Sequence, residues 1–319
     1  MTPKIDILLA SYNGEDFIAE QIDAVLAQTY QDFRLIIRDD GSSDSTPAII
    51  EDYARRYPAK IVIVHDDVVC RNPTKNFMEL VKHAKADYVM FCDQDDVWLP
   101  YKVRITLDYM EAAELANPDK PVLVFTGLHE VDRHLVSMDK YRNLGLSRER
   151  YSLKSLLVCN CISGCTEMVN RKLYSRLGEY DDRIEFHDWW TALYASATGV
   201  ICHVPMALID YRQHGNNVTF VQEAPHFRKI RIISSIVFSP LKKYAYSRKK
   251  FRLQGGMYIL LKERFSQEIL PENQKYIDDY IALFGRSRLK RLGAYIRSDY
   301  RKVYGLFENV MFVLKLLFL

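Results

Sequence analysis

Short apolar runs recur at a regular interval near the start of the chain, and this spacing limits the possible folds more than any other feature of the sequence. Four runs start about 27 residues apart, at Ile5–Leu9, Phe33–Ile37, Ile61–Val64 and Tyr88–Cys92. Runs of this kind are typical of strands that are buried on both faces. The segments between them have helical apolar spacing, and one begins at Thr46-Pro47, an N-cap residue followed by Pro in the first turn. This alternation predicts an α/β fold with a mostly parallel sheet.

The pattern changes after a fifth apolar run at Val122–Thr126. A polar stretch through Arg150 predicts a long loop, and it precedes a further segment around Ser163–Val169. A helix is predicted to start near Asp188.

Two short strands are then predicted at Val200–Val204 and Ala207–Tyr211, with Pro205 in the turn between them. The second half is therefore expected to be mixed rather than purely parallel. Beyond Phe220 the pattern becomes helical and basic, so we predict a catalytic domain at residues 1–220 and an extension at residues 221–319.

The charge of the chain is divided unevenly between these two parts. The 319 residues carry a formal net charge of +3, but residues 221–319 contain 20 Lys and Arg against 8 Asp and Glu, which leaves the first part acidic. Hydrophobic residues make up 48% of the chain, which excludes wholesale disorder. The basic extension, with apolar residues near Leu319, predicts peripheral contact with a membrane; the alternatives are packing on the catalytic domain or in an oligomer such as a homodimer. An acidic catalytic domain makes nucleic-acid binding a poorer fit.

The first residues do not have the pattern of a signal peptide, and no run of 18 uncharged apolar residues occurs. We therefore expect a cytoplasmic protein, peripheral at the inner face of the cell membrane. In that compartment its six cysteines stay reduced. Cys159, Cys161 and Cys165 have a metal-like C-x-C-x₃-C spacing but lack a second pair of ligands, so buried thiols on a strand are the preferred interpretation.

Polar clusters follow three of the predicted strands. They occupy Ala10–Gly14, Asp39–Asp44 and Asp93–Asp96. Each alone is also typical of a solvated turn, but the carboxyl ends of parallel strands face one crevice. Carboxylates gathered there repel one another unless a cation is present, and Mg²⁺ or Mn²⁺ with a bound diphosphate suits these ligands. The motifs of P-loop enzymes and of dinucleotide oxidoreductases are absent from the sequence.

Two later clusters also carry reactive groups. In the first, Asp188 is either a helix cap or a general base, and Trp189 and Trp190 provide aromatic surface on which a sugar could lie. In the second, Arg212 and His214 leave a strand, and His214 is a candidate ligand for a metal or a phosphate as well as a candidate structural residue.

These clusters, in this order, resemble glycosyltransferase family 2, inverting enzymes with the Rossmann-like GT-A fold. The matching motifs are Ile7–Gly14, Arg38–Asp44 and Asp93–Trp98, and the similarity extends over about residues 3–220. The Asp-Gln-Asp-Asp form and the later motifs Ser163–Thr166, His187–Trp190 and Tyr211–Asn217 are most similar to bacterial rhamnosyltransferases of polysaccharide biosynthesis.

The resemblance implies a role for each motif residue. Asp188 would be the catalytic base, although His187 stands where many members have Glu. Asp95 would hold the metal, with His214 completing metal or diphosphate binding. The nucleotide-sugar site would comprise Ser11, Tyr12, Asn13, Asp40, Asp93, Asp95 and Arg212, with Tyr12 and Asp40 at the base and Asp93 on the ribose side. Trp189 and Trp190 would face the acceptor.

The same resemblance implies the reaction. We expect inverting transfer of L-rhamnose from dTDP-β-L-rhamnose to a lipid-linked saccharide in the biosynthesis of bacterial cell-wall or surface polysaccharide. A UDP-hexose or UDP-N-acetylhexosamine donor is an alternative on the same fold. Two further alternatives are a scaffold that binds nucleotide sugars without catalysis and a metal-dependent nucleotidyltransferase or phosphohydrolase.

Overall fold

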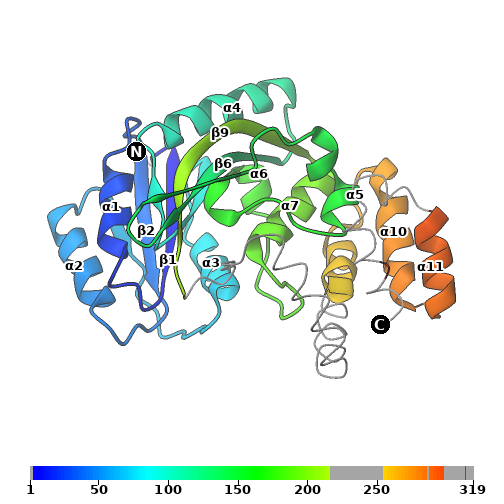
Figure 1. Ribbon diagram of the computed structural model, residues 1–319, viewed down its shortest axis with the longest axis horizontal. Helices are drawn as coiled ribbons and strands as arrows, with labels where there is room; N and C mark the ends of the chain where they lie inside the picture. Colours follow the sequence, from blue (N-terminus) through cyan, green and yellow to red (C-terminus); the bar gives the residue numbers. More distant parts are fainter. Residues whose placement is uncertain (1–2, 216–253, 286, 298–312, 314–319) are drawn as a thin grey trace.

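The computed structural model describes residues 3–215, 254–285, 287–297 and 313. One nine-stranded sheet runs through the molecule with the strand order β3-β2-β1-β4-β8-β6-β9-β5, and β7 pairs with β6 outside this path (Figure 1). Helices cover both faces of the sheet. The α/β class and the GT-A-like architecture expected from the sequence are therefore confirmed.

The first four strands match the apolar runs closely. They are β1 (Ile5–Ser11), β2 (Phe33–Asp39), β3 (Ile61–Ile63) and β4 (Tyr88–Asp93). β1 lies between β2 and β4, and all the pairings among these four strands are parallel. The carboxyl ends of β1, β2 and β4 therefore lie side by side at one edge of the sheet, which brings the three polar clusters together.

Alternate residues of each strand enter two different cores. On β1, Leu8 enters one core, whereas Ile7 and Leu9 enter the other. The second core is covered by α1 (Ile18–Leu26), α2 (Thr46–Arg56) and α4 (Lys102–Ala116), and the first by α3 (Pro73–Val81), α5 (Leu153–Leu156), α6 (Arg171–Tyr174) and α7 (His187–Thr198). Burial on both faces explains why these strands are apolar along their whole length.

The second half of the sheet is mixed, as expected. It contains β5 (Val97–Trp98), β6 (Val122–Asp132), β7 (Ser137–Arg142), β8 (Glu167–Asn170) and β9 (Val200–Gln213). β6 runs parallel to β9 but antiparallel to β7 and β8. Short 3₁₀ turns at Arg148–Tyr151 and Gly164–Thr166 complete this half.

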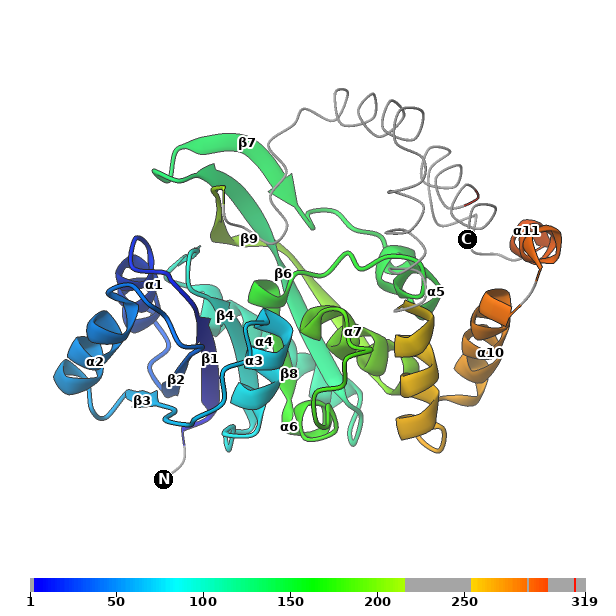
Figure 2. The ribbon, with the colours of Figure 1, turned by 90° about the horizontal axis from the view of Figure 1, so that it is seen from below.

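Two expectations for this half were wrong. The polar stretch before Arg150 is not simply a loop, because β6 continues through Asp132 and turns into β7 to form a long hairpin (Figure 2). The two strands predicted around Pro205 form the single strand β9, whose pairing with β6 shifts register between Val204 and Ala207. Proline has no N–H to donate, so it is accommodated in this irregularity rather than in a turn.

The C-terminal region contributes a helical segment at residues 254–265, α10 (Pro271–Gly285) and α11 (Arg288–Arg297). Met257, Phe265 and Tyr280 of this region are buried in the same core as α7. The expected boundary near residue 220, the basic run at residues 248–250 and the apolar C-terminal residues apart from Val313 lie outside the described residues. Within the described part, no helix combines the length and the apolar character needed to cross a membrane.

Candidate active site

The loops that follow β1 and β2 are joined by hydrogen bonds. Asn13 has a positive φ of 46°, and its backbone N–H donates to Ser42 Oγ at 2.8 Å. Its side-chain oxygen accepts from the Ser43 N–H at 2.9 Å. Tyr12 is bound through both of its backbone polar groups to the Gln94 amide at 2.8 and 2.9 Å, which leaves its ring exposed at the edge of the site.

The two acidic residues at the end of β2 are held by groups of the protein. Asp39 accepts from the Gly41 and Ser42 N–H groups at 3.1 and 2.8 Å, and from the buried Ser11 hydroxyl at 3.0 Å. Asp40 is buried, and one of its oxygens accepts from the Cys70 N–H at 2.5 Å and faces Arg38 at 3.5 Å. The predicted contacts of Ser11, Tyr12, Asn13 and Asp40 with a nucleotide stay predictions.

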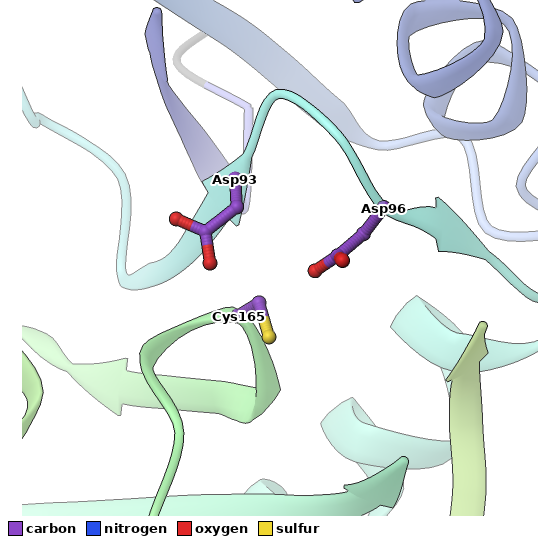
Figure 3. A group of neighbouring side chains, drawn as sticks. All are labelled: Asp93, Asp96 and Cys165. Atoms are coloured by element: carbon purple, nitrogen blue, oxygen red, sulfur yellow. The ribbon is translucent and has the colours of Figure 1, made fainter. Parts of the chain in front are cut away.

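A different arrangement follows β4. The carboxylates of Asp93 and Asp96 and the thiol of Cys165, which lies in the 3₁₀ turn at Gly164–Thr166, place one ligand atom each within 4.8 Å of the others (Figure 3). Asp96 is fully buried; its Oδ1 accepts from the Arg212 N–H at 3.2 Å. Burial, together with the charge of Asp95, raises the pKa of Asp93 to about 7 and that of Asp96 well above its usual value. These groups repel one another as anions, and they could hold a metal ion.

A buried lysine lies beneath this cluster. The Lys102 Nζ is 3.9 Å from the centroid of the Trp98 ring, and burial lowers its pKa to about 8. The nearby Cys165, Cys92 and Asp96 side chains act on this pKa in the opposite direction. Lys102 is therefore close enough to the cluster to offset part of its charge.

Asp95 points to a different partner from Asp93 and Asp96. Its Oδ2 lies 2.8 Å from His214 Nε2, and its backbone carbonyl accepts from Arg212 Nε at 2.8 Å. Arg212 is buried and also forms an ion pair with Glu20. The His214 ring stacks on Phe17 with the ring centroids 4.7 Å apart. The structure thus brings together Asp95, His214 and Arg212, which the sequence analysis had assigned to one site.

Asp188 lies in the first turn of α7. Its Oδ1 accepts from the Trp189 N–H at 2.5 Å and its Oδ2 accepts from the Gly164 N–H at 3.2 Å. Burial raises the pKa of Asp188 to about 7, and the charge of Asp188 in turn contributes to the raised pKa of Asp93. Because Gly164 is followed by Cys165, whose thiol lies within 4.8 Å of Asp93 and Asp96, the same 3₁₀ turn links Asp188 to the acids that follow β4.

Trp189 and Trp190 were predicted to face the acceptor, but the structure buries both side chains. Their exposed fractions are 4% and 0%, and their indole N–H groups donate to the Leu156 and Leu177 carbonyls at 2.6 and 3.0 Å. Trp190 packs against Phe265 of the C-terminal region. Both indoles are therefore part of the hydrophobic core. Neither ring has an exposed face on which a sugar could stack.

His187, the residue that departs from the family pattern, is also enclosed. Its ring stacks on Phe77 with the centroids 4.1 Å apart and meets the edge of Phe91 at 5.1 Å. Burial lowers its pKa to about 3, so the imidazole is neutral at physiological pH. A Cβ on Gly164 would lie 2.5 Å from His187 Nε2, so the 3₁₀ turn can approach α7 this closely only with glycine at that position.

Sequence reasoning missed Glu167. This residue begins β8 and is fully buried, and neither carboxyl oxygen has a hydrogen-bond partner among the described residues. Burial and then the charge of Asp188 raise its pKa well above the usual value. The available signal was a lone acidic residue within the buried segment Ser163–Val169. The expectation that Cys159, Cys161 and Cys165 are buried thiols on a strand was wrong in part. Cys165 is buried but lies in the 3₁₀ turn, Cys161 is half-buried and Cys159 is exposed, and none of them is on a strand.

Comparison with known proteins identifies the family. Residues 6–178, more than half of the chain, match the family model described as glycosyl transferase family 2, and the chain belongs to this family. It is 27% identical over 195 residues to an uncharacterized glycosyltransferase of Rickettsia typhi, covering 59% of this chain and 57% of that relative. The chain therefore spans little more than half of the length of that protein.

Two further similarities concern named proteins. The chain is 26% identical to the dTDP-rhamnosyl transferase RfbG of Shigella flexneri over 224 residues, covering 66% of this chain and 72% of RfbG. Residues 1–349 of S. aureus TarS, solved in complex with UDP-GlcNAc, superpose with a TM-score of 0.56 at 16% identity, covering 97% of this chain and 83% of TarS 1–349. At that identity the superposition supports the fold alone.

Proposed function

We propose that the chain transfers a sugar from a nucleoside-diphosphate donor to an acceptor hydroxyl with inversion at the anomeric carbon, and that Asp188 is the general base. The observation that carries the proposal is that Asp188 accepts from the Gly164 N–H at 3.2 Å, in the same 3₁₀ turn whose Cys165 thiol lies within 4.8 Å of the Asp93 carboxylate. Burial raises the pKa of Asp93 and of Asp188 to about 7. A carboxyl group with a pKa near neutrality is well suited to accept the proton of an attacking hydroxyl. Attack in line with the departing diphosphate inverts the configuration.

We propose that Asp95 and His214 hold a divalent cation. The carboxylate oxygen and the imidazole nitrogen lie 2.8 Å apart and form a donor set compatible with Mg²⁺ or Mn²⁺. The nearby Asp93 and Asp96 have raised pKa values because of burial and the charge of Asp95, and a cation beside them would offset this repulsion. Such a cation would neutralise charge on the diphosphate. Arg212 fixes the loop by binding the Asp95 carbonyl.

We propose dTDP-β-L-rhamnose as the donor and a lipid-linked saccharide as the acceptor, which would give an α-L-rhamnoside of bacterial surface polysaccharide. The support is the set of motifs shared with rhamnosyltransferases and the similarity to a protein named as a dTDP-rhamnosyl transferase. Peripheral contact of residues 221–319 with the inner face of the membrane is part of the same proposal, because this region is strongly basic. Flotation with anionic and with neutral vesicles tests that part.

The central experiment offers the protein dTDP-rhamnose, UDP-glucose and UDP-N-acetylglucosamine in turn, each with Mn²⁺ and octyl saccharides. We expect a product whose mass is increased by one deoxyhexose from dTDP-rhamnose alone. Transfer from a UDP-sugar alone would assign a different donor. Donor binding without transfer or hydrolysis would instead indicate a scaffold.

A further inference from the structure

A row of side chains crosses the curled end of the sheet next to the candidate site. Tyr141 on β7 pairs with His129 on β6, and His129 pairs with Asp210 on β9. The rings of Tyr141 and His129 stack with their centroids 4.7 Å apart and an interplanar angle of 22°. His129 Nδ1 lies 2.9 Å from Asp210 Oδ1. The three side chains therefore lie in contact on one face of the sheet.

The row also continues directly into the residues around Asp95. Asp210 is followed two positions later on β9 by Arg212, which binds the Asp95 carbonyl, and then by His214, which binds the Asp95 carboxylate. Alternate residues of a strand are about 7 Å apart. Moreover, the end of β6 extends past its pairing with β8, in the direction of the carboxyl ends of the parallel strands (Figure 2).

The chemistry of the row suits a saccharide. Tyr141 is 57% exposed and presents the outer face of a ring that His129 supports from below. His129 is fixed at both nitrogens, by Asp210 and by Ser137 Oγ at 2.7 Å. A flat apolar face beside a carboxylate and a hydroxyl provides packing for the C–H face of a sugar and hydrogen-bond partners for its hydroxyls. Trp189 and Trp190, buried in the core, cannot provide this surface.

We propose that Tyr141, His129 and Asp210 form the surface that binds the saccharide part of the acceptor, with Tyr141 stacking on a sugar ring beyond the one that receives the new residue. This inference rests on the proposed glycosyltransferase function and specifies how its acceptor is recognised. His129 and Asp210 act as positioning residues for Tyr141.

The test compares acceptors of increasing length with a series of variants. Octyl L-rhamnosides with one, two and three sugar residues are offered to the full chain with dTDP-rhamnose and Mn²⁺. We expect the acceptor KM of the native protein to fall with length, and Tyr141→Ala to raise the KM of the longest acceptor about three- to tenfold, the range of an aromatic stacking contact. Tyr141→Phe retains the ring and is expected to retain the KM. Tyr57→Ala removes an exposed tyrosine from the far end of α2 and serves as the matched control.

Donor hydrolysis without acceptor separates this inference from the proposed function. Tyr141→Ala is expected to hydrolyse dTDP-rhamnose at the native rate, because Tyr141 does not belong to the donor site. An unchanged acceptor KM in Tyr141→Ala, or an equal rise in Tyr57→Ala, would overturn the inference while leaving the enzyme assignment intact. Loss of donor hydrolysis in Tyr141→Ala would also overturn it. If the native protein does not bind, hydrolyse or transfer from any donor, the proposed function is wrong. The inference is then wrong as well, because it rests on that function.

Discussion

The carboxylates that follow β2 and those that follow β4 occupy neighbouring places at the same edge of the sheet, yet their surroundings differ. Asp39 accepts hydrogen bonds from two backbone N–H groups and two hydroxyls, and Asp40 is held by Arg38 and the Cys70 N–H. Asp93 and Asp96 instead face each other, and burial raises the pKa of both. The first pair is neutralised or hydrogen-bonded by the protein itself, whereas the second needs a proton or a cation.

This difference concerns what each pair of acids contributes to the stability of the fold. A carboxylate that is fully hydrogen-bonded in the folded state contributes to stability, so its removal weakens the fold. A carboxylate that is buried among other acids without enough donors destabilises the fold, and such residues are retained for binding or catalysis. The comparison therefore predicts opposite results for substitutions in the two groups.

The largest effect is expected for Asp188→Asn. Removal of the general base is predicted to lower kcat by about 10²–10⁴-fold while the donor still binds, because the carboxylate acts on the acceptor hydroxyl. Initial rates with dTDP-rhamnose and titration of dTDP measure the two properties. The exposed Asp182, changed to Asn, is the control. Native turnover by Asp188→Asn would refute its assignment.

A smaller loss is expected for Asp95→Ala. Removal of the proposed ligand is predicted to weaken the apparent affinity for Mn²⁺ by at least about 10–100-fold, because the loss of a residue that merely orients a metal ligand already costs this much. Turnover measured across a Mn²⁺ titration gives this value, and Asp67→Ala tests an exposed acid outside the site. The same Mn²⁺ dependence in Asp95→Ala and in the native protein would contradict the role.

The raised pKa of Asp188 predicts the dependence of activity on pH. The base is active when deprotonated, so kcat/KM is expected to fall tenfold for each pH unit below about 7 and to level off above it. Measurement of kcat/KM from pH 5 to 9 checks this acidic limb of the pH profile. A limb centred near pH 4, the ordinary value for Asp, would show that Asp188 is either not the base or not buried in the working enzyme.

The smallest effects are changes in stability, and their signs oppose each other. Asp39→Asn is expected to lower the free energy of unfolding by about 1–2 kcal/mol, because hydrogen bonds of the loop are lost. Asp93, one of the acids after β4, has a folded pKa of about 7, above the unfolded value, so its ionisation destabilises the metal-free fold as pH rises from about 4 to 7. Asp93→Asn is therefore expected to raise the free energy of unfolding at pH 8. Urea unfolding measures the free energy of unfolding of both variants. A change of the same sign in the two would contradict the proposed difference between the two pairs of acids.

Much of the fold could be predicted from the sequence because burial on both faces leaves a strong signal. The runs beginning at Ile5, Phe33, Ile61 and Tyr88 each start a strand at the same residue. The acidic clusters meet because parallel strands end at one edge. β9 could not be predicted as one strand, because Pro205 is also typical of a turn and the register shift depends on pairing with β6.

The surroundings of individual side chains were less predictable. Trp190 packs against Phe265 of the C-terminal region, and the Trp189 indole binds the Leu156 carbonyl of α5. Nothing within the motif itself indicates that these segments cover it. Glu167 is buried because β8 lies between β4 and β6, a placement that the sequence does not show. The contact between Tyr141 and His129 likewise requires the β6–β7 hairpin. The polar sequence before Arg150 had predicted a loop instead of this hairpin.

The most direct test of the account is calorimetric titration of the native protein with dTDP in the presence of Mn²⁺ and in the presence of EDTA. If the acids after β4 are completed by a cation that binds the diphosphate, dTDP binds with Mn²⁺ and its affinity falls at least tenfold in EDTA. Equal affinity in the two buffers would contradict that claim.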